Sequence, residues 1–292
     1  MKKKTALALG AFDGLHKGHI KVLNQAINNE NLISGVVTFN ENPTKILKNS
    51  TEYLLSEDDK EEILKEIGIK NIYKLDFAKV KDISPEDFFH DILLKKLGAK
   101  VLTCGDNFRF GKKALGDVKL LKKLCDENNI TLKVVSPFEI DGEIVSSTRI
   151  RTAVKNGDMI TATKLLGRHF GFSFEVVTGN KIGRTLGTPT INQNFPQGFV
   201  IPKYGVYASI VHINGTKYAG VTNIGVKPSI GKYDPLSETW IPNIDMDLYG
   251  MKIKVEILEF IREEKKFENL DKLKSEIFKN GEKAKEICSK YW

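Results

Sequence analysis

Short apolar runs alternate with helix-length amphipathic stretches through the first half of the chain. This alternation predicts an α/β domain in which parallel strands are joined by right-handed helical crossovers. Ligands of parallel sheets bind beyond the carboxyl ends of the strands. The strands are expected at 6–9, 34–38, 72–75, 100–104 and 132–135, and the helices at 19–28, 57–67, 85–97 and 118–128.

The pattern changes after Gly167. Alternating or β-branched runs follow, separated by turn residues such as Asn214-Gly215, and no helix-length amphipathic stretch appears before Asn269. This half predicts a closed antiparallel β-barrel followed by a C-terminal helix of about twenty residues. The strands are expected at 172–178, 205–213, 216–221 and 251–261.

The length of 292 residues accommodates two domains, each with its own core. Between the two patterns, residues 146–166 are typical of two short helices split by Asn156-Gly157-Asp158. We therefore expect one domain at 1–165 and a second at 166–292.

Composition limits the setting in which the chain works. Hydrophobic residues make up 41% and charged residues 28%, which is typical of soluble globular proteins. The apolar run at 5–9 is too short for a signal-peptide core, and no run has the length of a membrane span. We expect a cytoplasmic protein without a membrane partner. Cys104, Cys125 and Cys288 are odd in number and widely spaced, so they are expected as reduced thiols.

The net charge of +8 is spread along the chain instead of being gathered into one basic run. Such a charge suits phosphate-rich small ligands as well as polynucleotides. We expect no nucleic-acid partner, and a monomer or weak oligomer. A basic nucleic-acid-binding protein built on an enzyme scaffold is the alternative from a different functional class.

The decapeptide Gly10–His19, Gly-Ala-Phe-Asp-Gly-Leu-His-Lys-Gly-His, follows the first expected strand directly. A strand that leads through a glycine-bearing turn into a helix presents backbone N–H groups and the positive helix end to an anion. His16 and His19 are three residues apart, so both imidazoles can face the same phosphate. Gly14 and Gly18 leave room for a ligand near the backbone. These features suit nucleotidyl transfer. The alternative is a plain strand–turn–helix with two surface histidines.

Two further stretches of the first half combine anion-binding residue types. Ser146–Arg151, Ser-Ser-Thr-Arg-Ile-Arg, places hydroxyls and two arginines at an expected helix start, where they suit outer phosphates and a departing pyrophosphate. The loop 105–111 follows the fourth strand. Its Phe108 and Phe110 suit stacking on a planar ring, with Arg109 on a phosphate. Alternatively, the hydroxyls only cap a helix and the phenylalanines only anchor the loop.

The second half contains one glycine-rich stretch, 179–192. Its glycines suit a loop around phosphates, and Thr190 and Asn192 offer oxygens suited to Mg²⁺ or phosphate. The alternative is a glycine-rich β-turn. Glu238, in an expected strand, can accept a proton from a substrate hydroxyl, although an isolated glutamate is also typical of a surface charge.

These four stretches, in this order and over nearly the entire chain, resemble the bacterial bifunctional riboflavin kinase/FMN adenylyltransferase (FAD synthetase) family. The resemblance implies a Rossmann-like HxGH nucleotidylyltransferase domain with a parallel sheet, followed by a flavokinase-type antiparallel β-barrel with a C-terminal helix. It implies that the second domain phosphorylates riboflavin to FMN. The first would adenylylate FMN to FAD and release pyrophosphate. The implied ligands are riboflavin, FMN, FAD, ATP, ADP, pyrophosphate and Mg²⁺.

The resemblance also implies residue roles. His16 and His19 would stabilise the α-phosphate in the transition state, and Glu238 would be the general base of the kinase. Thr190 and Asn192 would bind Mg²⁺ and ATP. The nucleotide-binding residues of the first domain would be Gly10, Phe12, Asp13, Gly14, Gly18, Ser146, Ser147, Thr148, Arg149 and Arg151; the flavin-side loop would supply Asn107, Phe108 and Arg109; and the ATP and Mg²⁺ site of the second domain would include Gly179, Lys181, Gly187, Thr190 and Asn192.

The chain departs from the family pattern in three places. Asn40–Pro43 replaces an acid followed by Pro-His-Pro, Pro242–Ile244 replaces Leu-Asp-Phe, and Thr188 replaces the Phe of Gly-Phe-Pro-Thr. The first departure leaves open a riboflavin kinase with a weakened or repurposed adenylyltransferase domain. An adenylyltransferase for another phosphorylated acceptor, with a regulatory barrel, is a further alternative.

Overall fold

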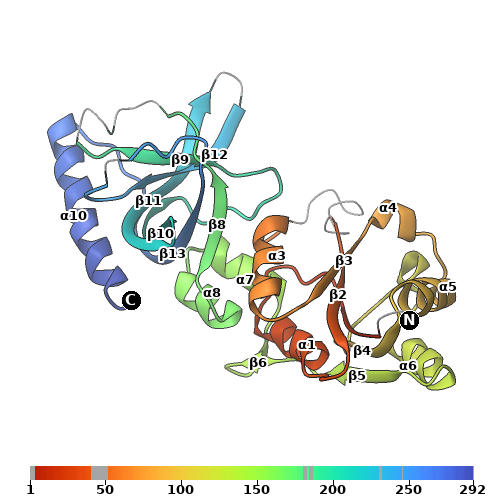
Figure 1. Cartoon of the computed structure of the whole chain (residues 1–292). Coiled ribbons are helices and arrows are strands. Elements are labelled where there is room, and N and C mark those ends of the chain that lie inside the picture. The colour runs from red at the N-terminus through yellow and green to blue at the C-terminus, as the bar shows by residue number, and fades with distance from the viewer. Residues whose placement is uncertain are drawn as a thin grey trace. The chain divides into compact units, whose positions relative to one another are not determined.

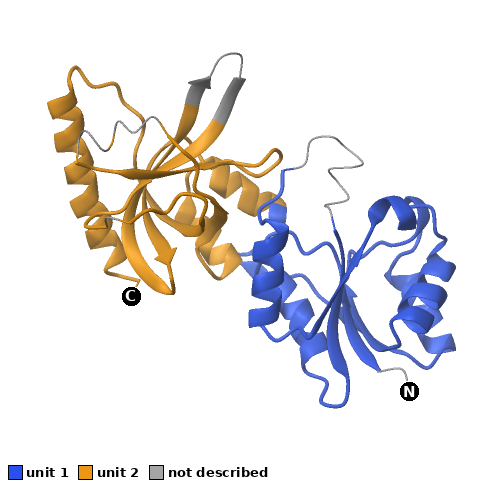
Figure 2. Cartoon of the chain, turned by 45° about the horizontal axis from the view of Figure 1, so that its top comes forward, with its two compact units in different colours: residues 1–147 blue, residues 148–292 orange. Residues whose placement is uncertain are grey.

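The computed structural model describes residues 4–40, 52–179, 183, 187–229, 232–244 and 246–291. The chain divides into two compact units, residues 1–147 and 148–292 (Figure 2). Each unit is built around its own sheet (Figure 1).

The first unit contains a five-stranded, fully parallel sheet in the order β3-β2-β1-β4-β5. The chain winds outward from β1 in one direction and then returns to add β4 and β5 on its other side. The switch point therefore lies between β1 and β4, where ligands of such sheets bind. The strands are β1 (Thr5–Leu9), β2 (Ile33–Phe39), β3 (Asn71–Leu75), β4 (Ala99–Gly105) and β5 (Thr131–Val135).

Two apolar cores cover the two faces of this sheet, because successive residues of a strand point to opposite faces. On one face, Ala6 and Ala8 of β1 are buried with Leu23 of α1 and Leu64 of α3. On the other face, Leu7 and Leu9 join a second core. The helices are α1 (Lys17–Ile27), α3 (Glu57–Glu66), α4 (Phe77–Val80), α5 (Pro85–Asp87) and α6 (Val118–Glu127).

The helix predicted at 85–97 differs in its winding. After α5 the chain continues as a π-helix over Phe88–Lys96, and the N–H of Leu97 donates to the carbonyl of Ile92, five residues back, at 3.0 Å. The wider turn still buries Phe89 and Leu93 completely. Apolar burial therefore fixes where this segment packs, while the π winding was not visible in the sequence.

The second unit contains a six-stranded antiparallel sheet in the order β8-β13-β10-β11-β12-β9. The sheet curls into a half-barrel, with α10 (Leu270–Cys288) packed along it (Figure 1). The predicted antiparallel barrel domain with a terminal helix is confirmed, and its sheet has the curvature of a half-barrel. The strands are β8 (Phe170–Glu175), β9 (Thr190–Asn194), β10 (Gly205–Ile213), β11 (Thr216–Ser229), β12 (Lys232–Trp240) and β13 (Lys252–Arg262).

The two edges of the curled sheet meet at β9. The N–H of Val177, just after β8, donates to the carbonyl of Asn192 at 2.8 Å. The buried amide of Gln193 donates to the carbonyls of Phe174 and Ile253 at 2.7 and 2.8 Å. The strand β9 therefore includes residues 190–192, the last part of the stretch 179–192 that was predicted to be a loop or turn.

The helices α7 (Ser147–Lys155) and α8 (Met159–Leu166) match the two short helices expected over 146–166. The helix α8 packs on β8 and β13, and the N–H of Lys203 donates to the carbonyl of Val154 at 3.2 Å. These contacts group residues 148–165 with the second unit. The domain limits 1–165 and 166–292 remain a prediction.

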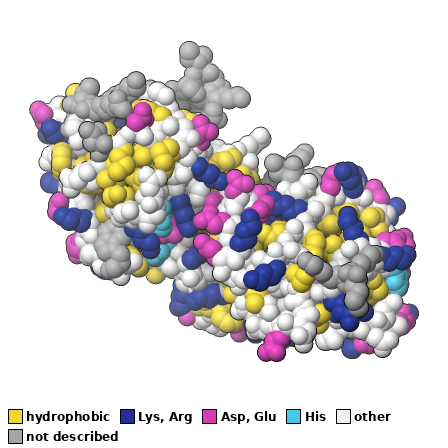
Figure 3. All heavy atoms as spheres, viewed as in Figure 1, with side chains coloured by type: hydrophobic (Ala, Val, Ile, Leu, Met, Phe, Trp, Pro, Cys, Tyr) yellow, Lys and Arg dark blue, Asp and Glu magenta, His cyan; other side chains and the backbone are white. Residues whose placement is uncertain are grey.

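Three further properties concern the surface charge, the cysteines and the length of the helices. Lysine and arginine side chains are interspersed with aspartate and glutamate side chains on the face shown in Figure 3. Cys104, Cys125 and Cys288 are free and buried, and burial raises the pKa of each thiol, to about 11, 12 and 11 respectively. Among the described residues, no helix combines the length and apolar character needed to cross a membrane.

Candidate functional sites

The turn after β1 is held in an unusual backbone conformation. Phe12 and Leu15 have φ values of 53° and 43°, and Gly14 has a φ of 79°. The N–H of Gly10 donates to Val37 of β2 at 3.2 Å, and Thr38 Oγ1 donates to the carbonyl of Ala11 at 3.1 Å. Left-handed residues other than glycine are uncommon and are enriched at functional sites. The sheet therefore fixes a strained turn at its switch point.

The two histidines of this turn lie together at the start of α1. His16 is the N-cap, and its Nδ1 accepts a hydrogen bond from the backbone N–H of His19 at 3.3 Å. The two rings stack with centroids 3.6 Å apart and planes 17° from parallel. A ring nitrogen that accepts a hydrogen bond carries no proton, so the neutral His16 ring carries its proton on Nε2. The N-terminus of α1 supplies positive potential beside both rings.

The glycines and Phe12 of the turn are explained by packing inside the protein. A Cβ on Gly14 would lie 2.8 Å from Leu54, and a Cβ on Gly18 would lie 3.1 Å from the His16 ring. Phe12 is buried and meets the His19 ring edge to face at 5.4 Å. Side chains of the protein itself therefore lie close to both glycines, and the nucleotide-binding role of Gly14 and Gly18 stays a prediction.

Asp13 joins the turn to two other segments. Its Oδ1 accepts a hydrogen bond from the N–H of Leu54 at 2.9 Å. Its carbonyl accepts one from Ser147 Oγ at 2.8 Å. The structure thus brings Ser147 to the decapeptide although 134 residues separate it from Asp13. Ser146 precedes α7 and is partly buried; Thr148, Arg149 and Arg151 follow along α7 within the second unit.

The loop 105–111 follows β4, the strand beside β1 across the switch point. Phe110 is 5% exposed and packs against Phe88, so the core-anchor alternative is correct for this residue. Phe108 is partly buried and stacks on Phe110 at 5.7 Å. Asn107 and Arg109 are exposed, and Arg109 pairs loosely with Asp117 at 3.8 Å. Asn107, Phe108 and Arg109 thus keep accessible surface at the ligand edge of the sheet.

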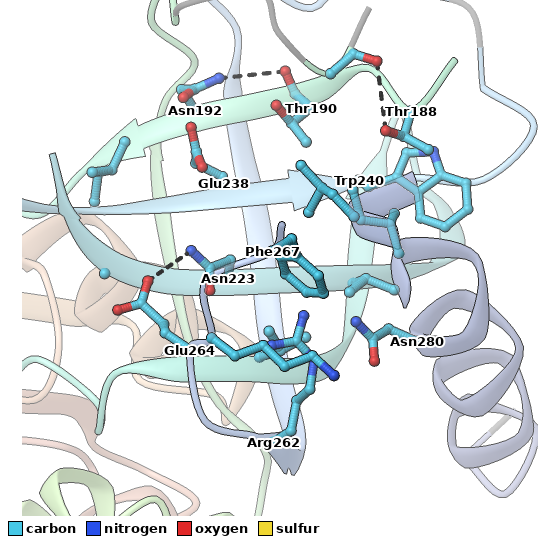
Figure 4. A pocket seen from close by; sticks show the side chains of 18 of the residues that line it. Thr188, Thr190, Asn192, Asn223, Glu238, Trp240, Arg262, Glu264, Phe267 and Asn280 are labelled. Carbon is cyan, nitrogen blue, oxygen red and sulfur yellow. Dashed lines mark hydrogen bonds between the residues drawn. The ribbon is translucent and has the colours of Figure 1, made fainter. Parts of the chain in front are cut away.

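The second unit contains a cavity of about 500 Å³ that is lined by Thr190, Asn192 and Glu238. Strand pairing aligns Asn192 with Glu238 and Glu238 with Asn223. Residues paired directly across antiparallel strands point to the same face. Figure 4 shows these three side chains following one another across β9, β12 and β11.

The same row continues over two more strands. Asn223 pairs with Val206 of β10, and Val206 pairs with Arg262 of β13. Asn192, Glu238, Asn223, Val206 and Arg262 all line the cavity. We call these five residues the transverse row. One row of side chains across five strands therefore forms the floor of the site.

Asn192 carries the clearest sign of a missing partner. It is 5% exposed, and its Oδ1 is buried without a hydrogen-bond partner among the described residues. Its Nδ2 is 3.4 Å from the carbonyl of Thr190. Buried polar atoms are normally satisfied, so this oxygen is suited to a ligand. Gly179 permits this placement, because a Cβ there would lie 2.5 Å from the Asn192 amide.

The other predicted residues of this site have different positions. Gly187 is exposed and has a φ of 75°. It is not among the described residues that line the cavity. Lys181 and residues 41–43 of the altered stretch lie outside the described residues. Within the described ranges, no group of three His, Cys, Asp or Glu side chains could hold a metal ion. Metal binding at the cavity would therefore use hydroxyl and amide oxygens with phosphate.

Sequence reasoning did not assign Arg262 or its partners to a site. Arg262 Nε lies 3.2 Å from Glu276 of α10, and Lys265 Nζ lies 3.0 Å from the same carboxylate. The Arg262 guanidinium is 5.7 Å from the centre of the Phe267 ring. Asn223 Nδ2 donates to Glu264 at 3.2 Å. The available signal was the rarity of arginine, since only six of the 45 basic residues are arginines and Arg262 is one of them.

The far end of the cavity is apolar. Trp240 of β12, Phe267, and Leu273 and Ile277 of α10 line it. Trp240 is two residues from Glu238 on the same strand and therefore on the same face. The cavity thus has a polar end at β9 and a largely apolar end at α10.

Two family models match the chain. The model described as FAD synthetase matches residues 1–149, and the model described as riboflavin kinase matches residues 166–288. The first contains the histidine turn and the loop after β4. The second contains the transverse row.

Whole-length relatives carry the name bifunctional riboflavin kinase/FMN adenylyltransferase. The protein from Buchnera aphidicola subsp. Schizaphis graminum is 34% identical over 302 residues, covering 100% of this chain and 95% of its own length. Those from Bacillus subtilis and Escherichia coli K12 are each 33% identical, covering 96% of this chain and 92% of their own.

A solved structure shares the fold over the whole chain. The crystal structure of a macrolide-efflux protein from Streptococcus pneumoniae is similar with a TM-score of 0.86 and 30% sequence identity. The likeness covers 100% of this chain and 95% of that one.

Proposed function

Because this chain belongs to the family of bifunctional riboflavin kinase/FMN adenylyltransferases, we propose residue roles for its two reactions. The enzyme phosphorylates riboflavin to FMN with ATP, and it adenylylates FMN to FAD with release of pyrophosphate. Both domain models match, which favours this function over a kinase with a repurposed first domain. The transverse row is the observation that supports the kinase assignment most directly.

In the kinase, Glu238 acts as the general base. It accepts the proton of the riboflavin 5′-hydroxyl as that oxygen bonds to the γ-phosphorus of ATP. The bond between the γ-phosphorus and the bridging oxygen breaks, and ADP leaves. Asn223, adjacent in register, is held by Glu264 and defines the flavin side of the base. Positioning and charge neutralisation supply most of the acceleration in phosphoryl transfer.

Thr190 and Asn192 are the residues that would hold Mg²⁺ with ATP. The buried Oδ1 of Asn192 has no partner among the described residues, and neutral oxygens suit a hard cation that keeps several phosphate and water ligands. When bound, Mg²⁺ neutralises charge on the phosphate oxygens. Gly179 acts indirectly by leaving room for the Asn192 amide.

In the adenylyltransferase, a phosphate oxygen of FMN bonds to the α-phosphorus of ATP and pyrophosphate leaves. His16 donates from Nε2 to an α-phosphate oxygen, and His19 stacks beside it to act on the same group. Ser146, Ser147 and Thr148 would bind outer phosphate oxygens, and Arg149 and Arg151 would neutralise the pyrophosphate.

The loop after β4 would bind FMN. Phe108 offers a partly exposed ring, Arg109 an exposed guanidinium for the FMN phosphate, and Asn107 an exposed amide.

We further propose that the enzyme acts in the cytoplasm, as a monomer or weak oligomer and without nucleic acid. Its free thiols and its use of ATP support that location.

The test is to incubate the purified full chain with riboflavin, ATP and Mg²⁺ and to separate the flavins over time. We expect FMN to appear first and FAD to follow, and FMN supplied directly should give FAD. Failure to produce either flavin would overturn the function. FMN without FAD would favour the weakened first domain, and FAD from added FMN alone would favour a barrel without kinase activity.

A further inference from the structure

A neutral polar side chain, that of Asn280, lies among the apolar residues at the α10 end of the kinase cavity. Asn280 of α10 lines the cavity and is only 5% exposed. Figure 4 shows its amide directed from α10 toward the space beside Phe267. In the described part of the chain, no hydrogen bond joins this amide to another group of the protein. A polar side chain that belongs to a largely buried residue and faces a cavity is suited to a ligand.

Close packing fixes the orientation of α10 on the sheet. Gly281 follows Asn280, and a Cβ there would lie 2.6 Å from the ring of Trp240. Ala284, Ile287 and Cys288 of the same helix are buried in the core against β10 and β11. The helix therefore has one orientation on the sheet, and that orientation keeps Asn280 at the cavity.

The distance along the cavity indicates which substrate reaches Asn280. Glu238 and Trp240 are alternate residues of β12, about 7 Å apart along the strand. Asn280 precedes Gly281, which packs against the Trp240 ring, so Asn280 lies at the Trp240 end of the cavity. A molecule whose hydroxyl is at Glu238 and whose ring system lies among Trp240, Phe267 and Ile277 would end at Asn280. Riboflavin has this shape, with a flexible ribityl chain and a tricyclic ring.

We propose that Asn280 recognises the imide edge of the flavin ring and thereby sets the acceptor specificity of the kinase. The edge presents a ring N3–H between two carbonyls. The Asn280 Oδ1 would accept from N3–H, and Nδ2 would donate to a neighbouring carbonyl, so one amide pairs with both groups. This inference rests on the proposed kinase site. Adenine also offers a donor beside an acceptor, and binding of ATP at this end is the competing outcome.

The test compares riboflavin with 3-methylriboflavin, in which the N3 proton is replaced by a methyl group. We expect the full-length enzyme to prefer riboflavin by at least about 10-fold in kcat/KM. Asn280→Leu should lower kcat/KM for riboflavin by about 10- to 100-fold through KM, and it should remove the preference. The KM for ATP should stay unchanged. Asn280→Ala, which adds no bulk, should behave in the same way.

Internal controls separate this inference from the kinase function. FAD formation from added FMN reports that the full chain is folded, and Ser275→Ala is a matched exposed change on α10. Equal preference for the two flavins in the wild-type enzyme would overturn the inference, as would an Asn280→Leu enzyme that keeps the preference. A rise in KM for ATP alone would assign Asn280 to adenine. If the wild-type enzyme makes no FMN, the kinase function itself fails.

Discussion

The two candidate sites are built in opposite ways. The adenylyltransferase site centres on one contiguous turn, in which His16 caps the helix that contains His19. The kinase site is a row of single residues from five strands, with Asn192 and Arg262 at its ends. A contiguous motif carries its own geometry, whereas a row across strands exists only when every strand has the correct register.

The sites also differ in whether the same residues both hold the backbone and are predicted to bind the ligand. In the turn, Asp13 and His16 hold the backbone through their side chains and are also the residues predicted to bind the ligand. In the kinase cavity, the buried Oδ1 of Asn192 has no partner among the described residues, and Asn280 also lines the cavity. We therefore expect substitutions in the turn to affect folding and catalysis together, and substitutions in the cavity to affect mainly ligands.

The largest expected effect is at the general base. Glu238→Gln keeps the size of the side chain but cannot accept the proton, so FMN formation should fall by about 10²- to 10⁴-fold. FAD formation from FMN should be unchanged, as measured by flavin separation. Glu175→Gln on β8, an exposed glutamate of the same unit, is the matched control. Equal loss of both activities would contradict two independent sites.

His16→Asn separates the cap from the chemistry. Asparagine is a preferred N-cap and can still accept from the N–H of His19, but it lacks the ring Nε2. FAD formation should fall by about 10²- to 10³-fold, while thermal stability and FMN formation stay near wild type. His90→Asn is the matched control, because it changes a histidine of the same unit that lies outside the turn. Retained FAD synthesis in His16→Asn would show that His16 serves only as a cap.

Gly179→Ala tests indirect support of the cation site. The added Cβ would displace the Asn192 amide, so the Mg²⁺ concentration needed for half-maximal FMN formation should rise about 10-fold. Asn192→Ala should raise it at least as much. Asn194→Ala, exposed on the same strand, should not. A Mg²⁺ requirement that is identical in all four proteins would argue against cation binding by Asn192.

The smallest effect is expected at Glu276, which holds Arg262 and Lys265. Glu276→Gln should cost about 1 kcal/mol at neutral pH and lower the Tm by about 2–4 °C. The hydrogen bond from Lys265 holds the pKa of Glu276 below its ordinary value. A lowered carboxyl pKa stabilises the fold above the unfolded-state value, and that contribution disappears as pH falls through the folded-state value.

The difference between wild type and Glu276→Gln should therefore shrink as acid is added. Thermal unfolding measured between neutral and acidic pH checks this, with exposed Glu282→Gln as the control. A difference that stays constant with pH would mean that packing, and not the ion pairs, accounts for the loss.

Local patterns in the sequence predicted most of the secondary structure. All five parallel strands and the terminal helix α10 lie within one or two residues of their predicted positions. The strand β9 was missed because Thr190–Asn194 is polar, and its pairing depends on Val177 and on the buried amide of Gln193. Such a strand has no hydrophobic alternation to reveal it.

The sequence by itself determined the α/β and β-barrel halves, the histidine turn and the residue types for phosphate chemistry, because these depend on neighbours in the chain. The tertiary structure decided that Leu54 and His16 pack close to Gly14 and Gly18, that Arg262 joins Glu238 in one cavity, and that Asn280 lines its apolar end. Those features depend on strand register and helix packing, and a shift of one residue in β12 would turn Glu238 to the opposite face.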